Sequence, residues 1–352
     1  MTLLNRVRAN ARRILNPRQS AMEAEARSTR EALAAVFATG ETSALRGAFQ
    51  SASNAVREPI LAYCKTCSDI AEPDNHLIIV PSTMRGRAEH FHHFFNGFLL
   101  PLILRMETAP FSKTKTIHVP DVGPMNGILD DVLEHYDLEH VVRYPALLIP
   151  YQRAPQRIER AHLLGMDRVH KNRNWFQPHE IERFKQFADD FAPASAQTPL
   201  DVLLLVRKPA EDYYRSESYV ERYKHVSSYK LAGADRRSVA NPKEIASAIS
   251  QNLEVQSAVL EDLSFREQIA LFRRARVVVG QHCAGLNGLV WSKPEARVLE
   301  IIPLDRTENA VTFFRVLAEH MGQKHTYLVQ EGDHDAVDPQ AVADLVTFLL
   351  HA

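Results

Sequence analysis

Cysteine is scarce in this sequence, and its scarcity excludes several classes of protein. The chain has 352 residues and three cysteines, an odd number that argues against a disulfide framework and favours a reducing compartment. Two of them, Cys64 and Cys67, form a lone CxxC with no second pair to complete a zinc site. We interpret this spacing as incidental, in preference to a redox or metal role.

A charge excess of one sign and long hydrophobic runs are also lacking. The 42 basic and 43 acidic residues leave a formal net charge of -1, so no global field attracts the chain to nucleic acid. No apolar run reaches the roughly 20 residues that span a membrane, and arginines interrupt the N-terminus where a signal peptide would have its apolar core. No internal repeat is visible. We therefore expect a cytoplasmic protein.

The N-terminal segment does offer one route to a membrane surface. Residues 1–22 hold five arginines and no acidic residue, and Leu4, Val7, Ala11 and Ile14 share one face at helical spacing. A basic amphipathic helix over residues 1–18 would bind the inner face of a membrane peripherally. A solvated terminal helix is the alternative. The following residues favour helix up to Pro59.

The rest of the chain alternates short apolar runs with amphipathic segments, and its length suits two domains. A small, polar, Pro-bounded stretch at 192–199 is the best linker. The pattern predicts an α/β protein of two Rossmann-like domains facing across a cleft, with an extra helical N-terminal segment. The expected division is a helical segment at 1–60, a first domain at 61–191, a second at 200–335 and a terminal helix at 338–352. Strands are expected at 76–80, 116–119, 141–144, 201–206, 253–259, 277–279, 298–302 and 325–329, and the main helices at 130–140, 178–191, 307–320 and 339–351.

Residues 275–303 are the stretch around which the chain is organised. A β-branched run at 277–279 ends at Gly280, a small-residue turn at 282–286 follows, and a second apolar run stops at Pro303. Such a strand–turn–helix–strand unit exposes backbone N–H groups at a helix N-terminus, where a phosphate binds. His282 would add an imidazole at the carboxyl end of the first strand. An ordinary, tightly packed βαβ unit is the alternative.

A second notable stretch is rich in histidine. Residues 89–101 contain His90, His92 and His93 among four phenylalanines. Neighbouring positions on a helix diverge by about 100°, so His92 and His93 do not share a face and a metal site is not favoured. One of them could face the cleft as a proton acceptor, or both could be core or capping residues.

These two stretches resemble glycosyltransferase family 61. The C-terminal signature of that family is Gly-x-His-Gly-Ala-Gly-Leu, followed by a strand with Glu and then Pro. The matching residues are Gly280, His282, Ala284, Gly285, Leu286, Glu300 and Pro303. Cys283 departs from the usual Gly, and Asn287-Gly288 departs from a small residue followed by Asn. The His-rich stretch resembles the N-terminal helix of the family, with Asn96 where an Asp is usual. Arg207 and Arg236–Asn241 resemble two weaker elements, and we interpret the chain as a bacterial-type member.

The resemblance implies a GT-B fold and an inverting glycosyltransferase that needs no metal. Its donor would be a nucleotide sugar, with a UDP-sugar favoured, and its acceptor a glycan or glycolipid, in cell-surface polysaccharide or lipid-linked glycan synthesis. Chemistry then suggests roles. The diphosphate would be held by Arg207, Arg237, His282 and the N–H groups of Cys283, Ala284, Gly285 and Leu286. Glu300 would accept two ribose hydroxyl hydrogen bonds, and His93 or His92 would take the acceptor's proton.

Three other interpretations stay open at the level of sequence. A metal-dependent GT-A enzyme would use Asp333-His334-Asp335, although this motif follows the nucleotide half and suits a solvated loop. A polysaccharide pyruvyltransferase would share the paired Rossmann architecture. A non-catalytic scaffold that binds glycans or partners is suggested by Cys283 and Asn96. The Tyr-rich segment at 212–230 is either a mobile lid or a long insertion, and the basic segment at 152–174 either a solvated loop or part of the cleft border.

Overall fold

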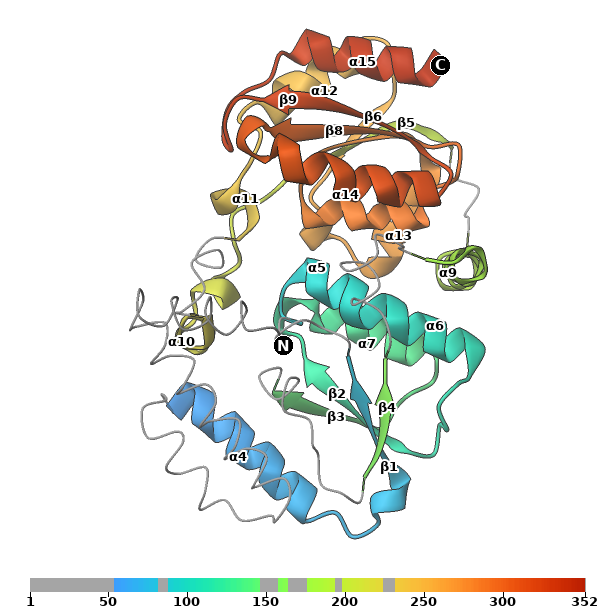
Figure 1. The fold of residues 1–352 in the computed structure, drawn as a ribbon, viewed down its shortest axis with the longest axis vertical. Coiled ribbons are helices and arrows are strands. Elements are labelled where there is room, and N and C mark those ends of the chain that lie inside the picture. The colour runs from blue at the N-terminus through green and yellow to red at the C-terminus, as the bar shows by residue number, and fades with distance from the viewer. Residues whose placement is uncertain are drawn as a thin grey trace, which may run out of the picture.

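The computed structural model describes residues 54–81, 88–145, 158–163, 176–193, 198–223 and 232–351. Within these residues the strands form two parallel sheets, one of four strands and one of five, each with helices on its faces (Figure 1). The predicted α/β class is therefore confirmed. The proposed basic helix at 1–18 lies outside the described residues, and none of the described helices is long and apolar enough to cross a membrane.

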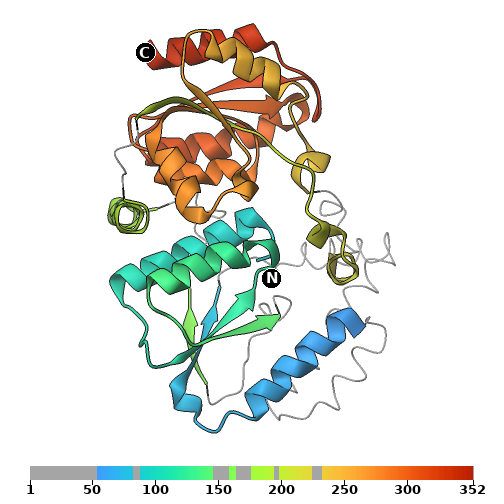
Figure 2. The same ribbon diagram turned by 180° about the vertical axis from the view of Figure 1, so that it is seen from behind.

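The four-stranded sheet has the order β3-β2-β1-β4. Its strands are β1 His76–Val80, β2 Thr116–Asp121, β3 Val141–Pro145 and β4 Glu159–His162. The accompanying helices are α4 Asn54–Ser68, α5 Phe91–Phe94, the π-helix η3 Phe95–Leu99, α6 Leu100–Thr108 and α7 Asn126–His135, with 3₁₀ turns η1 Pro73–Asn75 and η4 Gly123–Met125. In Figure 2, α6 and α7 lie between this sheet and the five-stranded half.

The five-stranded sheet has the order β6-β5-β7-β8-β9. Its strands are β5 Leu200–Leu205, β6 Val255–Ala258, β7 Ala275–Gln281, β8 Arg297–Pro303 and β9 Lys324–Gln330. Helices α12 Pro242–Ser250 and α15 Pro339–His351 cover its outer face, whereas α13 Phe265–Arg274 and α14 Thr307–His320 cover the face toward the other half (Figure 1). Shorter elements are η6 Asp212–Arg215, α10 Glu217–Tyr223, α11 Gly233–Arg236, η8 Leu260–Asp262, η9 Ala284–Trp291 and η10 Leu304–Arg306.

The central strands form because their sequences are nearly continuous apolar runs, as strands covered on both faces require. In β7 the residues Val277, Val278 and Val279 are fully buried. Helix α13 begins at the predicted capping box, where Ser264 Oγ accepts from the N–H of Glu267 and the Glu267 carboxylate accepts from the N–H of Ser264. Gly322, with φ +75°, ends α14 as predicted.

The strand order of the five-stranded sheet marks a binding position. Counted along the chain from β5, the order is 2-1-3-4-5, so the direction of winding reverses between β5 and β7. In open parallel sheets, ligands bind at the carboxyl ends of the strands on either side of such a reversal. Arg207 follows β5 and His282 follows β7, so both lie at this point.

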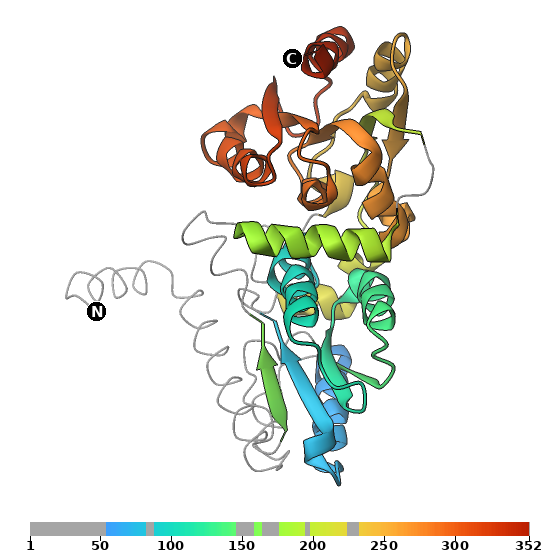
Figure 3. The same ribbon diagram turned by 90° about the vertical axis from the view of Figure 1, so that its right-hand side faces the viewer.

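Packing joins the two halves. Helix α9 Pro178–Phe191 lies across the boundary between the sheets (Figure 3). One hydrophobic cluster contains Phe95 from the first half, Phe184 from α9 and Trp291 from the second half. The Trp291 ring centroid is 5.8 Å from that of Phe95 and 6.2 Å from that of Phe184, both edge-on. Buried aromatic contacts therefore hold the two halves together.

Most sequence-based boundaries are confirmed within one or two residues, and three expectations are wrong. Helix α4 does not end at Pro59 but continues to Ser68. It therefore crosses the expected domain limit at residue 60 and packs Ile60 and Tyr63 into the first core. The helix expected at 130–140 lies at Asn126–His135 and ends before Asp137, whose φ is +54°. Strand β4 lies within the basic segment that we expected to be a loop, and it pairs in parallel with β1.

Candidate functional site

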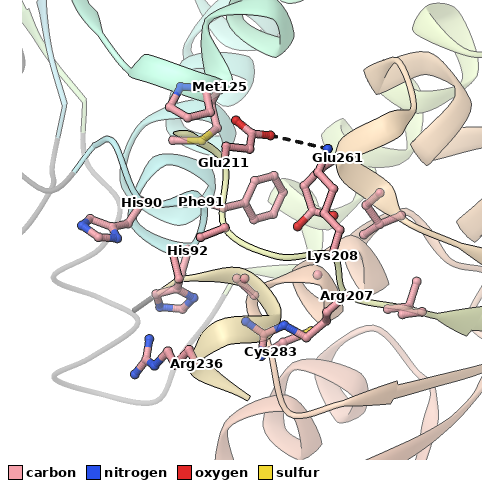
Figure 4. Close-up of a pocket in the computed structure, with 18 of the residues that line it drawn as sticks. His90, Phe91, His92, Met125, Arg207, Lys208, Glu211, Arg236, Glu261 and Cys283 are labelled. Atoms are coloured by element: carbon pink, nitrogen blue, oxygen red, sulfur yellow. Dashed lines mark ion pairs between the residues drawn. The ribbon is translucent and has the colours of Figure 1, made fainter. Parts of the chain in front are cut away.

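A cavity of about 1000 Å³ lies between the two halves. Its walls come from the His-rich stretch, the start of α7, the segments that follow β5, β6 and β7, and the residues around Gly233 and Phe314. Eight of the ten predicted site residues line it, namely His92, His93, Arg207, Arg237, His282, Cys283, Ala284 and Gly285. Residues that are far apart in the sequence are therefore brought together, and Figure 4 shows part of this lining.

The turn after β7 supplies backbone donors to the cavity. Its helical hydrogen bonds begin with the N–H of Leu286, which donates to the carbonyl of Cys283 over 3.1 Å. The N–H groups of Cys283, Ala284 and Gly285 precede that bond, as in the first turn of a helix. Leu286 itself has a fully buried side chain and does not line the cavity. Three of the four predicted residues of the turn, Cys283, Ala284 and Gly285, therefore line the cavity.

Arg207 brings a cation to the same place. Its Nη1 is buried and has no hydrogen-bonding partner among the described residues, although an unsatisfied buried charged donor is costly. In Figure 4, Arg207 lies beside Cys283. Lys208, the next residue, also lines the cavity, but its ammonium is already paired: its Nζ donates to Asp262 over 2.7 Å and lies 3.8 Å from Glu211. Arg236 and Arg237 also line the cavity, and Arg237 is almost completely buried.

Two of the departures from the family pattern, Asn96 and Asn287, contact each other across the boundary between the halves. Asn96 Nδ2 donates to Asn287 Oδ1 over 3.0 Å, and Asn287 Nδ2 donates to the carbonyl of Ala284 over 2.7 Å. Both amides lie near His92 Nδ1, at 3.3 and 3.4 Å. The Asn96–Asn287 pair therefore joins the His-rich stretch to the turn after β7.

The Tyr-rich segment docks on the first half and forms part of the side wall of the cavity. Tyr213 donates a hydrogen bond to the carboxylate of Glu89, and Tyr219 Oη lies 3.0 Å from His90 Nε2. Gly123 has φ +60°, and a Cβ there would lie 2.5 Å from the Tyr213 ring. Of the two interpretations of this segment, its described part, 212–223, is thus a docked insertion. Residues 224–231 lie outside the description.

Glu300 lies behind the cavity. Its side chain is fully buried, its Oε1 accepts from His282 Nδ1 over 2.5 Å, and its Oε2 accepts from His325 Nε2 over 2.7 Å. Burial alone would raise the pKa of Glu300, but the hydrogen bonds from His282 and His325 outweigh it, and the pKa falls below its ordinary value. Glu300 is not part of the cavity lining, so the predicted contact with ribose stays a prediction.

Sequence analysis missed four carboxylates in the cavity wall, namely Asp131, Glu211, Glu261 and Asp305. Burial raises the pKa of Glu261, which follows β6, and that of Asp131, which accepts a hydrogen bond from the backbone N–H of Phe265. Glu261 could have been found, because it follows a predicted strand beside the reversal of strand order. Asp131 could not, because its position depends on how the two halves pack.

The alternative motif at the C-terminal end lies away from this cavity. The carbonyl of Asp333 accepts hydrogen bonds from the N–H of Ser238 and from Gln281 Nε2, and neither Asp333 nor Asp335 lines the cavity. Over the described part of the chain, His, Cys, Asp and Glu side chains nowhere gather in a group of three that could hold a metal ion. The thiols of Cys64 and Cys67 are buried in the first core, and burial raises the pKa of Cys64 to about 12.

Comparison with known proteins identifies the family of the chain. Over 129 residues, 35% of its length, the chain is 28% identical to the β-1,2-xylosyltransferase RCN11 of Oryza sativa subsp. japonica. It covers only 21% of that relative, so the activity of the whole relative is not carried over. The model of the family described as Glycosyltransferase 61 matches residues 91–299, which include the His-rich stretch, Arg207 and the turn after β7. Because this match covers more than half of the sequence, the chain belongs to glycosyltransferase family 61.

Proposed function

We propose that this glycosyltransferase is an inverting, GT-B-type enzyme that transfers a sugar from a nucleotide sugar, preferably a UDP-sugar, to a glycan or glycolipid acceptor. In this proposal the five-stranded half holds the donor, and the four-stranded half presents the acceptor. The setting would be cell-surface polysaccharide or lipid-linked glycan synthesis in the cytoplasm.

The observation that carries the proposal is Arg207. Its guanidinium lines the cavity at the reversal of strand order, and its buried Nη1 lacks an acceptor among the described residues. A cation held in this way suits an anionic ligand, and the N–H groups of Cys283, Ala284 and Gly285 lie in the same wall. A diphosphate would accept hydrogen bonds from both. The cavity volume, about 1000 Å³, lies at the upper end of ligand pockets and suits a ligand as large as a nucleotide sugar.

The chemical step then divides between the two halves. The electron pair of the broken bond between the anomeric carbon and the diphosphate oxygen stays on that oxygen, where Arg207, Arg237 and the turn stabilise it. An acceptor hydroxyl attacks the anomeric carbon from the opposite side, and its proton passes to His93 or His92. Both imidazoles line the cavity, which makes them the candidates for this proton transfer.

A panel of nucleotide sugars tests the proposal directly. Purified protein is incubated with UDP-, GDP- and CMP-sugars. The release of the nucleoside diphosphate or, for the CMP-sugars, of the monophosphate is measured. We expect release from at least one UDP-sugar and loss of that release in Arg207→Met. Transfer from phosphoenolpyruvate without turnover of any nucleotide sugar would favour a pyruvyltransferase. Turnover of no donor and binding of no nucleotide would favour a non-catalytic scaffold.

A further inference from the structure

A buried carboxylate links two histidines beneath the cavity. Glu300 lies in the middle of β8, and its side chain is 0% exposed. His282 reaches it from the end of β7 and His325 from the start of β9, so three adjacent strands contribute one residue each. His325 aligns with Val298, two residues before Glu300 and on the same face of the sheet. The register of the sheet therefore assembles this cluster.

The hydrogen bonds define where the protons lie. The low pKa of Glu300 keeps its carboxylate ionised, so its two oxygens only accept. Nδ1 of His282 and Nε2 of His325 must therefore each carry a proton. The remaining nitrogen of His282, Nε2, lies on the opposite side of the ring and makes no hydrogen bond within the described residues. Because His282 lines the cavity and its Nδ1 is engaged by Glu300, Nε2 is the ring nitrogen left for a ligand there.

The two histidines differ in their exposure to water. An ionised carboxylate buried between two neutral imidazoles would leave an uncompensated charge away from water, which is costly. One imidazolium removes that cost. The side chain of His282 is 18% exposed and that of His325 is 1% exposed, so His282 is the better solvated of the two. The same cavity lining holds the negative charge of Asp305 and the positive charges of Arg207, Arg236 and Arg237. The Phe314 ring packs edge-on to His282 at 5.3 Å.

We propose that His325 and Glu300 are positioning residues that hold His282 as an imidazolium with its Nε2–H directed into the cavity, where it donates a hydrogen bond to the departing diphosphate. The inference rests on the proposed function, because it names a further group acting on the same leaving oxygen. No proton need be transferred: Nε2–H strengthens its hydrogen bond as negative charge develops on that oxygen. Glu300 never touches the substrate in this arrangement, and His325 acts only through Glu300.

The first measurement uses the wild-type protein without ligand. Nitrogen NMR of protein labelled at histidine, with the His282 signals assigned through His282→Gln, reports whether each ring nitrogen carries a proton. We expect both nitrogens of His282 to be protonated at neutral pH. We also expect a neutral ring in Glu300→Gln, which keeps the shape of the side chain and removes its charge. A neutral His282 in the wild-type protein would overturn the proposal, whether or not any nucleotide binds.

The second measurement distinguishes a positioning role of His325 and Glu300, which acts through His282, from a role in packing alone. We call the chain of hydrogen bonds from His325 through Glu300 to His282 the relay. UDP and GDP are titrated into the wild-type protein, Glu300→Gln, His325→Leu and His325→Gln. Of the two variants at position 325, only His325→Gln keeps a hydrogen-bond donor for Glu300. We expect the affinity for the bound nucleotide to fall at least about 10-fold in Glu300→Gln and His325→Leu, and to stay within about 3-fold in His325→Gln. His118→Gln, which changes a fully buried histidine of the other half, is the matched control.

The outcomes distinguish this inference from the proposed function. If the wild-type protein binds neither nucleotide, the proposed function fails, and the NMR result alone decides the charge state of His282. If Glu300→Gln weakens binding while both His325 variants bind normally and His282 keeps its charge, Glu300 contacts the ribose itself and the relay is wrong. Should His325→Leu fail to fold, Glu300→Gln and His325→Gln still give opposite predictions.

Discussion

Each half of the molecule contains a buried histidine network in which a central side chain is hydrogen-bonded to two partners. The two networks differ in the chemistry of the central side chain. In the first half, His118 is fully buried between Tyr63 and His76, with its Nδ1 3.1 Å from Tyr63 Oη and its Nε2 2.9 Å from His76 Nδ1. In the second half, Glu300 is fully buried between His282 and His325. Both networks join neighbouring strands through a central side chain that is excluded from water.

The difference lies in the central group and in what borders it. Burial, and then the charge of His76, lower the pKa of His118 to about 4, so His118 is neutral. His76, at the edge of this network, is partly exposed, and none of the three residues lines the cavity. Glu300 is ionised, and one of its partners reaches the cavity wall. A neutral network serves stability, whereas an ionised centre can hold a neighbouring imidazole charged for a ligand. Four measurements test whether the two networks differ in this way and whether the cavity binds a nucleotide.

The largest expected effect is on stability in acid, and it comes from the first network. The unfolded state binds a proton at His118 near its ordinary pKa, whereas the folded state resists it down to about pH 4. The stability that His118 contributes is therefore fully present above the ordinary pKa of histidine. It is lost as the pH falls from that value to about 4, by about 3 kcal/mol in total. Urea unfolding of the wild-type protein and His118→Gln across this range should show a smaller loss in the variant. Parallel pH curves would contradict the assignment of His118 as a buried neutral group.

The next effect concerns the cavity. Arg207→Met keeps the apolar stem and removes the buried guanidinium, so nucleoside diphosphate affinity should fall by about 2 kcal/mol, which is about 30-fold. The melting temperature should not fall, because Nη1 has no acceptor among the described residues when the cavity is empty. Arg276→Met is the control: Arg276 is an exposed residue of β7 whose ion pair with Asp201 lies outside the cavity. Lower stability with unchanged affinity in Arg207→Met would make Arg207 a structural residue.

A smaller effect is expected from the edge of the first network. Tyr63→Phe removes one hydrogen bond to His118, which should lower the free energy of unfolding by about 1 kcal/mol. Nucleotide affinity should stay unchanged, because Tyr63 lies outside the cavity lining. Chemical unfolding and calorimetric titration measure the two quantities. A change in affinity equal to the change in stability would show that the two networks are coupled.

The smallest effect should come from removing metal ions. We expect treatment with EDTA to leave donor turnover unchanged, because arginine and backbone donors are proposed to hold the diphosphate. Activity that EDTA abolishes and manganese restores would contradict this. Turnover with and without chelator in the same preparation is the measurement.

The sequence predicted the parts of this structure that depend on local pattern. Buried parallel strands are continuous apolar runs, so β1, β7 and β8 were placed correctly, and the capping box of α13 was readable from Ser264 and Glu267. The turn after β7 was found for the same reason, since its small residues follow a strand directly. The family itself was recognised from the residues of that turn and is confirmed.

What escaped prediction depends on which distant segments meet. That His325 would reach Glu300 follows from the register of β8 and β9, and no local pattern encodes that register. Asn96 and Asn287 were noticed as separate departures, whereas the structure joins them by a hydrogen bond across the halves. Strand β4 is short and polar and forms only because β1 offers an edge with which to pair.

The central claim is that the cavity binds a nucleoside diphosphate through its second-half wall, and one titration tests it most directly. UDP and GDP are titrated by calorimetry into the wild-type protein, His282→Gln and His118→Gln, with thermal melts of all three. We predict binding to the wild-type protein, affinity at least about 10-fold lower in His282→Gln, and affinity within about 2-fold of wild type in His118→Gln, the less stable variant. No binding by the wild-type protein, or equal affinity in all three, would contradict the account.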